Sequence, residues 1–323
     1  MHRETRIFVS IASYCDPVLG FTLARALATA RWPQRLHFGI VDQSPAASTE
    51  PLPADLEPAR LSYVRMDPVH ARGPCWARAI AMSLYDGEDW FFQIDSHMDF
   101  DGDWDQRLVA QAQALQSGRK GAVLSSYPSA FVFEDGRAVH RPTTRKVLAH
   151  VVRKGACFEP GHAGLAFEAH PLERDEPVAG FHLGAGCLFA PGNFVQAFAC
   201  DPWFYFHGEE QSLALRLFTH GWDIFHTPGL PVYHLYNQPG SGAPPRPMHW
   251  DAGHDAARTQ AWPLLERRAR ERLTALVAGR PMGVYGLGRE RSIADYAAFS
   301  GIDYVARTVA ARAYRPQALA AVG

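Results

Sequence analysis

The triplet Asp95-Ser96-His97 is the part of this sequence best suited to chemistry, because a carboxylate and an imidazole flank one small residue. It follows residues 90–94, which have strand character. Side chains alternate faces along a strand, so Asp95 and His97 are expected to point the same way and share one ion. A carboxylate with a neutral imidazole suits Mn²⁺ or Mg²⁺, which keep open positions for phosphate oxygens. By itself the triplet is weak evidence, because Asp and His in a loop after a strand are more often part of a turn or a helix cap.

The composition is that of a globular protein with a large core and no strong net charge. Of 323 residues, 47% are apolar and 12% aromatic, and 32 Lys and Arg stand against 33 Asp and Glu. This balance argues against nucleic acid or an anionic membrane as a partner. No segment approaches the roughly 18 continuous apolar residues of a membrane span, so a soluble, cytoplasmic protein is expected. Buried free thiols are expected at Cys15, Cys75, Cys157, Cys187 and Cys200, which include no Cys-x-x-Cys pair.

Strand and helix patterns alternate over roughly the first 130 residues, which predicts an α/β fold with a parallel sheet. The Asp16-Pro17 pair supplies a helix cap and a first-turn proline directly after the first strand. The Asp-x-His triplet then ends about the fourth strand, at the sheet edge where α/β proteins bind ligands. The predicted strands are 7–13, 36–41, 61–66, 90–94 and 122–126, and the predicted helices are 18–30, 75–85 and 104–115.

The second half of the chain is less regular. Residues 127–178 follow no clear period, as expected of loops and antiparallel additions that shape an acceptor cleft. Ordered segments are predicted at 181–189, at a helix beginning with Glu209-Glu210, and at two short strands, 222–226 and 231–236. The stretch 240–245 is expected to be a linker or lid, and 262–277 and 293–299 to be helices. We therefore expect a main domain over 1–250 and a small helical appendage over 251–323.

Three groups of sequence motifs, taken together, resemble those of one protein family. They are IASYCDP (11–17), RGPCWAR (72–78) with QIDSH (93–97), and GAGCLFA (184–190) with HGEEQSLALRL (207–217). The chain resembles nucleotide-sugar-dependent glycosyltransferases of the GT-A fold over most of its length, including GLGRERSIADY near the C-terminus. It is most similar to cytoplasmic N-acetylglucosaminyltransferases that modify hydroxyproline on a ubiquitin-ligase adaptor, and to their bacterial relatives. This resemblance implies a Rossmann-like, mostly parallel mixed sheet flanked by helices.

A more distant resemblance is to polypeptide N-acetylgalactosaminyltransferases, which share an Asp-Ser-His metal triplet and a Gly-Gly-Glu-Asn helix start. Here the second motif reads His207-Gly208-Glu209-Glu210. The His and the second Glu depart from that pattern, which leaves the identity of the sugar open.

Metal binding is implied by the resemblance for Asp95, for His97 and for His234 in PVYHLY. A histidine at position 234 is also compatible with an ordinary core residue. Transfer from a UDP-sugar expels a diphosphate, and a divalent ion such as Mn²⁺ or Mg²⁺ stabilises that leaving group as a Lewis acid. The triplet would then act as a DXD-like motif.

Nucleotide-sugar contacts are also implied by the resemblance. Alternatives compete at these positions: a helix cap at residue 16, a turn after residue 42, and solvated surface for the arginines. Arg289 and Arg291, in a glycine-rich turn before a helix, could bind an anion or simply tie the appendage to the core. The implied contacts to the uridine are Ser13, Tyr14, Asp16 and Asp42, and those to a phosphate or hydroxyl are Arg72 and Arg78. Further implied nucleotide-sugar contacts, with no part of the ligand assigned, are Ser96, Gly186, Arg289 and Arg291.

Glu209 and Glu210 are the candidate catalytic residues. One glutamate at a helix start is explained by the positive end of the helix dipole, but two in succession suggest that one faces the donor sugar or the acceptor hydroxyl. The match to the related motif favours Glu209. The resembled families retain anomeric configuration, which needs no dedicated base, so sugar or acceptor binding comes before a role as general base.

The leading hypothesis is a metal-dependent transfer of a sugar, N-acetylglucosamine first, from a UDP-sugar to a hydroxyl of protein, glycan or small molecule. A metal-dependent hydrolase or nucleotidyltransferase could use the same triplet but would need more clustered ligands. A non-catalytic carbohydrate-binding protein could stack sugars on the aromatic segment Trp203-Phe204-Tyr205.

Overall fold

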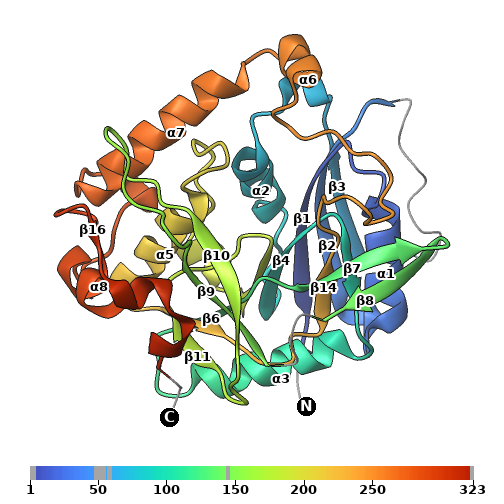
Figure 1. Ribbon diagram of the computed structural model, residues 1–323. Helices are drawn as coiled ribbons and strands as arrows, with labels where there is room; N and C mark the ends of the chain where they lie inside the picture. The colour runs from blue at the N-terminus through green and yellow to red at the C-terminus, as the bar shows by residue number, and fades with distance from the viewer. Residues whose placement is uncertain (1–4, 47–55, 57–59, 143–145, 321–323) are drawn as a thin grey trace.

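A central sheet of eight strands organises the protein in the computed structural model, which describes residues 5–46, 56, 60–142 and 146–320. The strands lie in the order β11-β13-β6-β12-β4-β1-β2-β3 (Figure 1). They are β1 (Ile7–Tyr14), β2 (Leu36–Gln43), β3 (Leu61–Arg65), β4 (Trp90–Asp95), β6 (Ala122–Ser125), β11 (Val178–Gly180), β12 (Cys187–Pro191) and β13 (Asp223–His226).

The sheet is mixed. β1 pairs in parallel with β2 and with β4, β2 with β3, and β6 with β13. β12 runs antiparallel between β4 and β6, and β11 runs antiparallel at the edge. The predicted fold class is confirmed, but the predicted ordered segment 181–189 is only partly strand: β12 begins at Cys187, and the residues before it form a loop.

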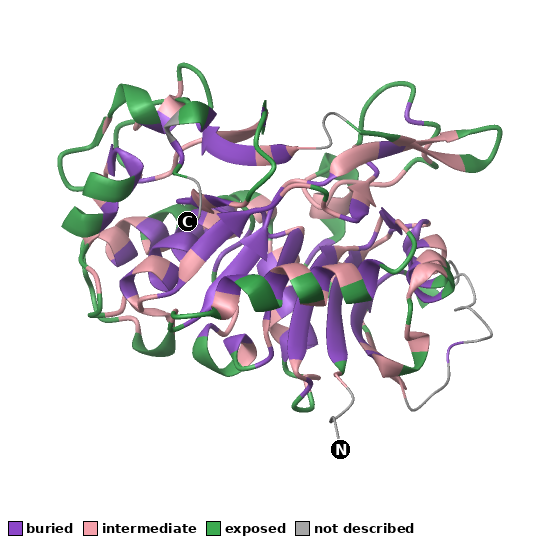
Figure 2. Ribbon diagram, turned by 90° about the horizontal axis from the view of Figure 1, so that it is seen from below, coloured by how far each residue is buried: buried purple, intermediate pink, exposed green. Residues whose placement is uncertain are grey.

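Helices cover both faces of the sheet, as the alternation of side chains along β1 requires. Ile7, Val9 and Ile11 share one core with α1 (Leu19–Thr29) and α3 (Trp104–Gln116). Phe8, which points to the other face, packs with α2 (Pro74–Met82) and α5 (Glu209–Thr219). Most strands of the central sheet are buried along most of their length, whereas the helices keep exposed residues on their outer sides (Figure 2).

The segment after residue 127 supplies antiparallel additions, as its composition predicted. A second sheet has the order β5-β14-β7-β8, and β9 pairs with β10 in a hairpin. The strands are β5 (Met98–Phe100), β7 (Ser129–Glu134), β8 (Arg137–Arg141), β9 (Val147–Val152), β10 (Phe167–Leu172) and β14 (Val232–His234).

The C-terminal helices share a core with the preceding residues. α7 (Trp262–Val277) and α8 (Ile293–Ser300) pack with Phe204, Tyr205 and β9, while α6 (Ala252–Ala257) lies against the end of β1 through His254 and Tyr14. The domain boundary at residue 250 stays a prediction. The remaining elements are α4 (Phe194–Ala197), β15 (Ile302–Asp303), β16 (Thr308–Val309) and the 3-10 turns Pro33–Arg35, Pro68–His70, Gly283–Tyr285, Ala311–Tyr314 and Pro316–Ala318.

Two expectations from composition can be compared with the structure. Among the described residues, no helix has both the length and the apolar character that a membrane crossing requires. All five cysteines are free thiols, but the prediction that they are buried is wrong for Cys157, which is exposed, and only partly right for Cys15 and Cys200.

Candidate active site

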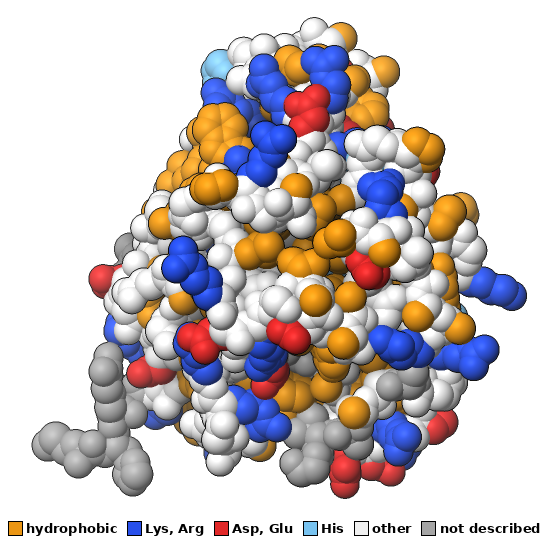
Figure 3. All heavy atoms as spheres, turned by 90° about the vertical axis from the view of Figure 1, so that its left-hand side faces the viewer, with side chains coloured by type: hydrophobic (Ala, Val, Ile, Leu, Met, Phe, Trp, Pro, Cys, Tyr) orange, Lys and Arg blue, Asp and Glu red, His pale blue; other side chains and the backbone are white. Residues whose placement is uncertain are grey.

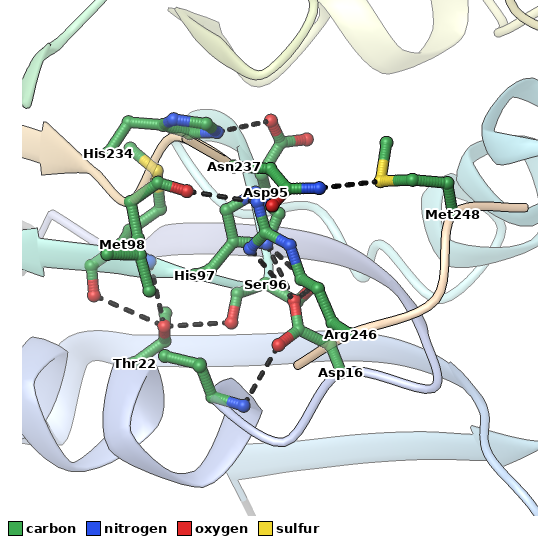
Figure 4. A network of polar contacts seen from close by, with 12 residues as sticks. Asp16, Thr22, Asp95, Ser96, His97, Met98, His234, Asn237, Arg246 and Met248 are labelled. Atoms are coloured by element: carbon green, nitrogen blue, oxygen red, sulfur yellow. Dashed lines mark hydrogen bonds and ion pairs between the residues drawn. The ribbon is translucent and has the colours of Figure 1, made fainter. Parts of the chain in front are cut away.

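Three side chains predicted to bind a metal converge at the carboxyl end of β4. Asp95, His97 and His234 each offer a ligand atom, and these atoms all lie within 4.8 Å of one another. His234 Nε2 is 3.3 Å from Asp95 Oδ2, and the two imidazole rings are 4.6 Å apart between centroids. Figure 4 shows His234 and Asp95 facing each other above His97. One carboxylate and two imidazoles form a donor set that suits a divalent transition-metal ion.

The convergence follows from the way β4 passes into the second sheet. β4 ends at Asp95, Ser96 and His97 form a bend, and β5 begins at Met98. β14 then pairs with β5 so that His234 lies opposite Met98, and the Leu235 N–H donates to the His97 carbonyl at 3.0 Å. The bend, rather than strand alternation, therefore brings the ligands together.

Gly186 makes room for the Asp95 carboxylate. A Cβ on residue 186 would lie 2.3 Å from Asp95 Oδ2 and 2.9 Å from its Cγ, which is closer than atoms can approach. The Gly186 carbonyl also accepts the Asp95 N–H at 3.2 Å. The loop before β12 thus fixes the position of the carboxylate from the far side.

Asp16 orients His97. Its Oδ2 accepts from His97 Nδ1 at 2.6 Å and from the Ser96 hydroxyl at 2.7 Å, while its Oδ1 accepts the Val18 N–H at 2.9 Å. Burial would raise the pKa of Asp16, but the hydrogen bond and charge of His97 outweigh burial and lower it. A proton held on Nδ1 leaves His97 Nε2 as the ligand nitrogen. Asp16, predicted as a uridine contact, and Ser96, predicted as a nucleotide-sugar contact, both lie behind this metal-binding group.

Arg78 links the candidate metal-binding cluster of Asp95, His97 and His234 to the helix that carries the candidate catalytic residues. It donates to Asp95 Oδ1 at 2.9 Å and to both oxygens of Glu209 at 2.8 Å, and its side chain is only 7% exposed. Burial would raise the pKa of Asp95, yet His234, Arg78 and His97 together hold that pKa far below its usual range. Asp95 is therefore a carboxylate, ready to bind a cation, at any physiological pH.

The two glutamates at the start of α5 have different surroundings. Glu209 is buried with both oxygens on Arg78, and Gly208 before it adopts the left-handed conformation that begins the helix. Glu210 accepts the Ala185 N–H at 2.9 Å and the Tyr127 hydroxyl at 3.2 Å, and lies 3.4 Å from His182 Nε2.

Glu210 is the more accessible of the two glutamates, with its side chain 30% exposed against 8% for Glu209. Burial would raise the pKa of Glu210, but His182, the Ala185 N–H and Arg78 lower it. Glu210 is consequently an ionised group that can accept a hydrogen bond from a hydroxyl.

The residues predicted to hold a uridine lie at the carboxyl ends of β1 and β2. Ser13 is paired with Asp42 in the sheet register. Asp42 accepts from the Tyr63 hydroxyl at 2.5 Å and the Ser44 hydroxyl at 2.7 Å, which fixes its carboxylate. The Tyr14 hydroxyl lies 3.0 Å from His254 Nδ1 in α6.

Sequence reasoning missed two arginines between β14 and α7. Arg246 has a side chain only 10% exposed, donates to the Leu235 carbonyl at 3.0 Å, and lies 3.7 Å from Asp16 Oδ2 (Figure 4). Arg258 is buried and donates to the hydroxyls of Tyr14 at 2.9 Å and Tyr205 at 3.3 Å. Their segment has no helical or strand period, so no pattern in the sequence marks them out.

The structure does not bring three predicted contacts into the cluster. Arg72 is exposed, with its guanidinium 5.5 Å from the Trp76 ring centroid. The loop of Arg289 and Arg291 lies at the C-terminal end of α5, where its Gly288 N–H donates to Thr219 Oγ1 at 2.8 Å. Glu209 and Thr219 are the first and last of the 11 residues of α5, so they lie roughly 15 Å apart at 1.5 Å per residue. This loop caps α5, and its N–H groups do not reach Glu209 or the Asp95 cluster.

Comparison with known protein families identifies the family of this chain. The profile of a family described as Glycosyltransferase (GlcNAc) matches residues 6–61 and 54–306. The chain belongs to this glycosyltransferase family. The resemblance that the sequence motifs indicated is thereby confirmed at the level of the family.

One solved structure supports a GT-A fold for this glycosyltransferase. A structure of GalNAc-T7 with UDP, GalNAc and Mn²⁺ matches at a TM-score of 0.52 and 15% identity, over 74% of this chain and 45% of that one. This chain therefore spans less than half of that structure's chain. TarS of S. aureus is more distant: its residues 1–349 match at a TM-score of 0.40 and 12% identity, over 71% of this chain and 60% of that chain. A comparison with curated proteins gave no match.

Proposed function

We propose that this glycosyltransferase transfers N-acetylglucosamine from a UDP-sugar to a hydroxyl acceptor, with a divalent metal ion and with retention of anomeric configuration. The observation that carries the proposal is the convergence of Asp95, His97 and His234 at the carboxyl end of β4. The family description favours N-acetylglucosamine. GalNAc-T7, which shares the fold, was solved with UDP and Mn²⁺, and that structure supports a UDP-sugar and Mn²⁺ as the first candidates here.

The residues present fit such a metal. The three side chains supply one oxygen and two nitrogens, His97 is oriented by Asp16, and Gly186 leaves space at Asp95 Oδ2. A divalent ion in this position would supply Lewis acidity to the departing diphosphate. Asp16 would orient the metal ligand His97 through its hydrogen bond to Nδ1. Removing a group of this kind typically lowers metal affinity 10- to 100-fold.

Positive charge for the diphosphate comes from the chain itself. Arg246 lies beside Asp16, largely buried, with its Nη1 in no hydrogen bond among the described residues. Arg258 lies at Tyr14, at the end of β1 where we place the uridine. We assign to Arg246 a contact with the diphosphate and to Arg258 the closure of the nucleotide pocket through Tyr14 and Tyr205.

Glu210 is the group that we place on the sugar or the acceptor hydroxyl. Glu209 has both oxygens on Arg78 and serves to hold that arginine against Asp95. Glu210 points its carboxylate toward Tyr127 and the Ala185 N–H and keeps acceptor capacity for a hydroxyl. Sugar or acceptor binding is its first role, and a role as general base comes second because its pKa is lowered.

Release of UDP from a panel of UDP-sugars with Mn²⁺ tests the proposal. Slow hydrolysis of UDP-N-acetylglucosamine in preference to other UDP-sugars is expected, and the Asp95→Asn protein should lose roughly 100-fold or more of the activity. Exposed Asp103, outside the site, provides the matched control Asp103→Asn, which should release UDP at the normal rate. Cleavage to UMP would instead indicate a nucleotidyltransferase or hydrolase. Sugar binding without turnover would indicate a carbohydrate-binding protein.

A further inference from the structure

A cavity lies at the other end of α5, away from the Asp95, His97 and His234 cluster where we place the UDP-sugar. It has a volume of about 450 Å³ and is bounded by α5, α8, β11 and β13. That volume falls in the range of pockets that hold small molecules. The C-terminal end of α5 borders this cavity, roughly 15 Å along the helix from Glu209. We call it the α5–α8 cavity, and it is lined by Phe181, Phe218, Trp222, Phe225, Tyr296 and Phe299.

The interior of the α5–α8 cavity is aromatic. Phe181, Trp222 and Tyr296 are each at most 5% exposed, whereas Phe299 is 41% exposed and forms an outer wall. Phe299 stacks on Phe218 with ring centroids 5.6 Å apart. On the face where α8 lies, hydrophobic side chains gather between scattered charged groups (Figure 3). An apolar or aromatic body is the ligand part that such walls favour.

The rim of the cavity carries two cations and one anion. Asp223 lies 2.8 Å from Arg291 Nη1 and 3.6 Å from Arg119 Nε, with each of the three side chains about one quarter to one third exposed. The two guanidinium groups also lie over Phe218 and Phe225, at 4.8 and 5.0 Å from the ring centroids. One carboxylate cannot neutralise two guanidiniums, so the rim has an excess of positive charge.

We propose that the α5–α8 cavity binds a small amphipathic anion, a molecule with an apolar or aromatic body and a single carboxylate, phosphate or sulfonate. The body occupies the aromatic interior, and the anionic group contacts the guanidinium groups of Arg119 and Arg291 on the sides that do not face Asp223. This assigns a role to Arg291, which does not reach the donor site. The ligand is a free small molecule rather than a membrane lipid, because the chain has a formal net charge of −1 and so has no overall positive charge to attract an anionic membrane.

Two fluorescent probes with the same type of aromatic body test the proposal: anilinonaphthalene sulfonate, an anion, and phenylnaphthylamine, which is uncharged. The native protein should bind the sulfonate in a one-to-one complex and at least roughly threefold more tightly than the uncharged probe. Phe299→Ala should weaken both probes, because it removes an outer wall.

Two charge variants should change the affinity for the sulfonate probe in opposite directions. Asp223→Asn releases both guanidiniums and should tighten sulfonate binding roughly threefold to tenfold, whereas Arg291→Gln should weaken it by a similar factor. Neither should change the binding of the uncharged probe. Unfolding midpoints of each variant establish that the fold persists.

Three results would overturn the proposal. The first is equal affinity for the two probes, the second is no gain from Asp223→Asn in a folded protein, and the third is tight binding to anionic phospholipid vesicles that Arg291→Gln abolishes. None of these measurements needs transferase activity, so the outcome is independent of the function proposed above.

Discussion

Replacing Arg78 by methionine should destabilise the protein strongly, because this buried cation holds two carboxylates. It donates two hydrogen bonds to Glu209 at 2.8 Å and one to Asp95 at 2.9 Å. Methionine fills similar space without the charge and leaves both carboxylates unpaired on that side. Breaking a buried ion pair from one side typically costs about 3–5 kcal/mol. We expect a loss of that size in the free energy of unfolding.

Urea unfolding of four proteins checks this reasoning: the native chain, Arg78→Met, Glu209→Gln and the double variant. If the cost arises from an uncompensated carboxylate, Glu209→Gln in the Arg78→Met background should recover about 1–3 kcal/mol. Exposed Arg137 offers a matched control, and Arg137→Met should change stability by less than about 0.5 kcal/mol. A loss below about 1 kcal/mol for Arg78→Met, or no recovery in the double variant, would refute the assignment of Arg78 as the counter-ion.

Three more predictions concern single groups of the structure. Gly186→Ala should lower UDP release about 10- to 100-fold, because its Cβ would displace the Asp95 carboxylate, whereas Gly102→Ala, with open space around it, should not. Burial lowers the pKa of His226 to about 4 from 6.5, so the unfolded chain takes up the proton first. The part of the stability that depends on His226 is complete above pH 6.5 and falls by about 3 kcal/mol toward pH 4. Buried His150, His234 and His249 also have lowered pKa values, so His226→Asn should remove only its own share of the slope in urea unfolding, and an unchanged slope contradicts the assignment. Arg246→Met should weaken UDP binding in calorimetry about tenfold at saturating Mn²⁺, and undiminished UDP affinity would exclude a diphosphate contact.

Local patterns in the sequence were enough to predict the elements around the donor site. The predicted strands 7–13, 36–41 and 90–94 correspond to β1, β2 and β4. Short apolar runs between predicted helices usually form buried strands, which explains why these predictions were correct. The convergence of Asp95, His97 and His234 was anticipated through resemblance, since the spacing from 97 to 234 contains no local information. The reason given for the first two, strand alternation, was wrong, because a bend separates them.

Long-range pairing accounts for what the sequence did not reveal. β12 inserts antiparallel between β4 and β6, and nothing in Cys187–Pro191 distinguishes that position from an edge. Arg258 bonds to Tyr14 across 244 positions of sequence, and Arg78 to Glu209 across 131. A side chain whose partner lies so far away carries no periodic signal, so its role is visible only after folding.

The charges gathered at the site explain why it combines three acidic groups with histidines and buried arginines. Asp16, Asp95 and Glu209 would repel one another if left alone in a partly buried space. Arg78 lies between Asp95 and Glu209, and Arg246 lies near Asp16, so the protein balances most of this charge itself. A divalent ion and the diphosphate of a UDP-sugar carry opposite charges of equal size, so the pair adds little net charge to that balance. In the proposed reaction the same cluster would therefore take up both together more readily than either alone, and Arg246 would be available to the negative charge that grows on the departing diphosphate.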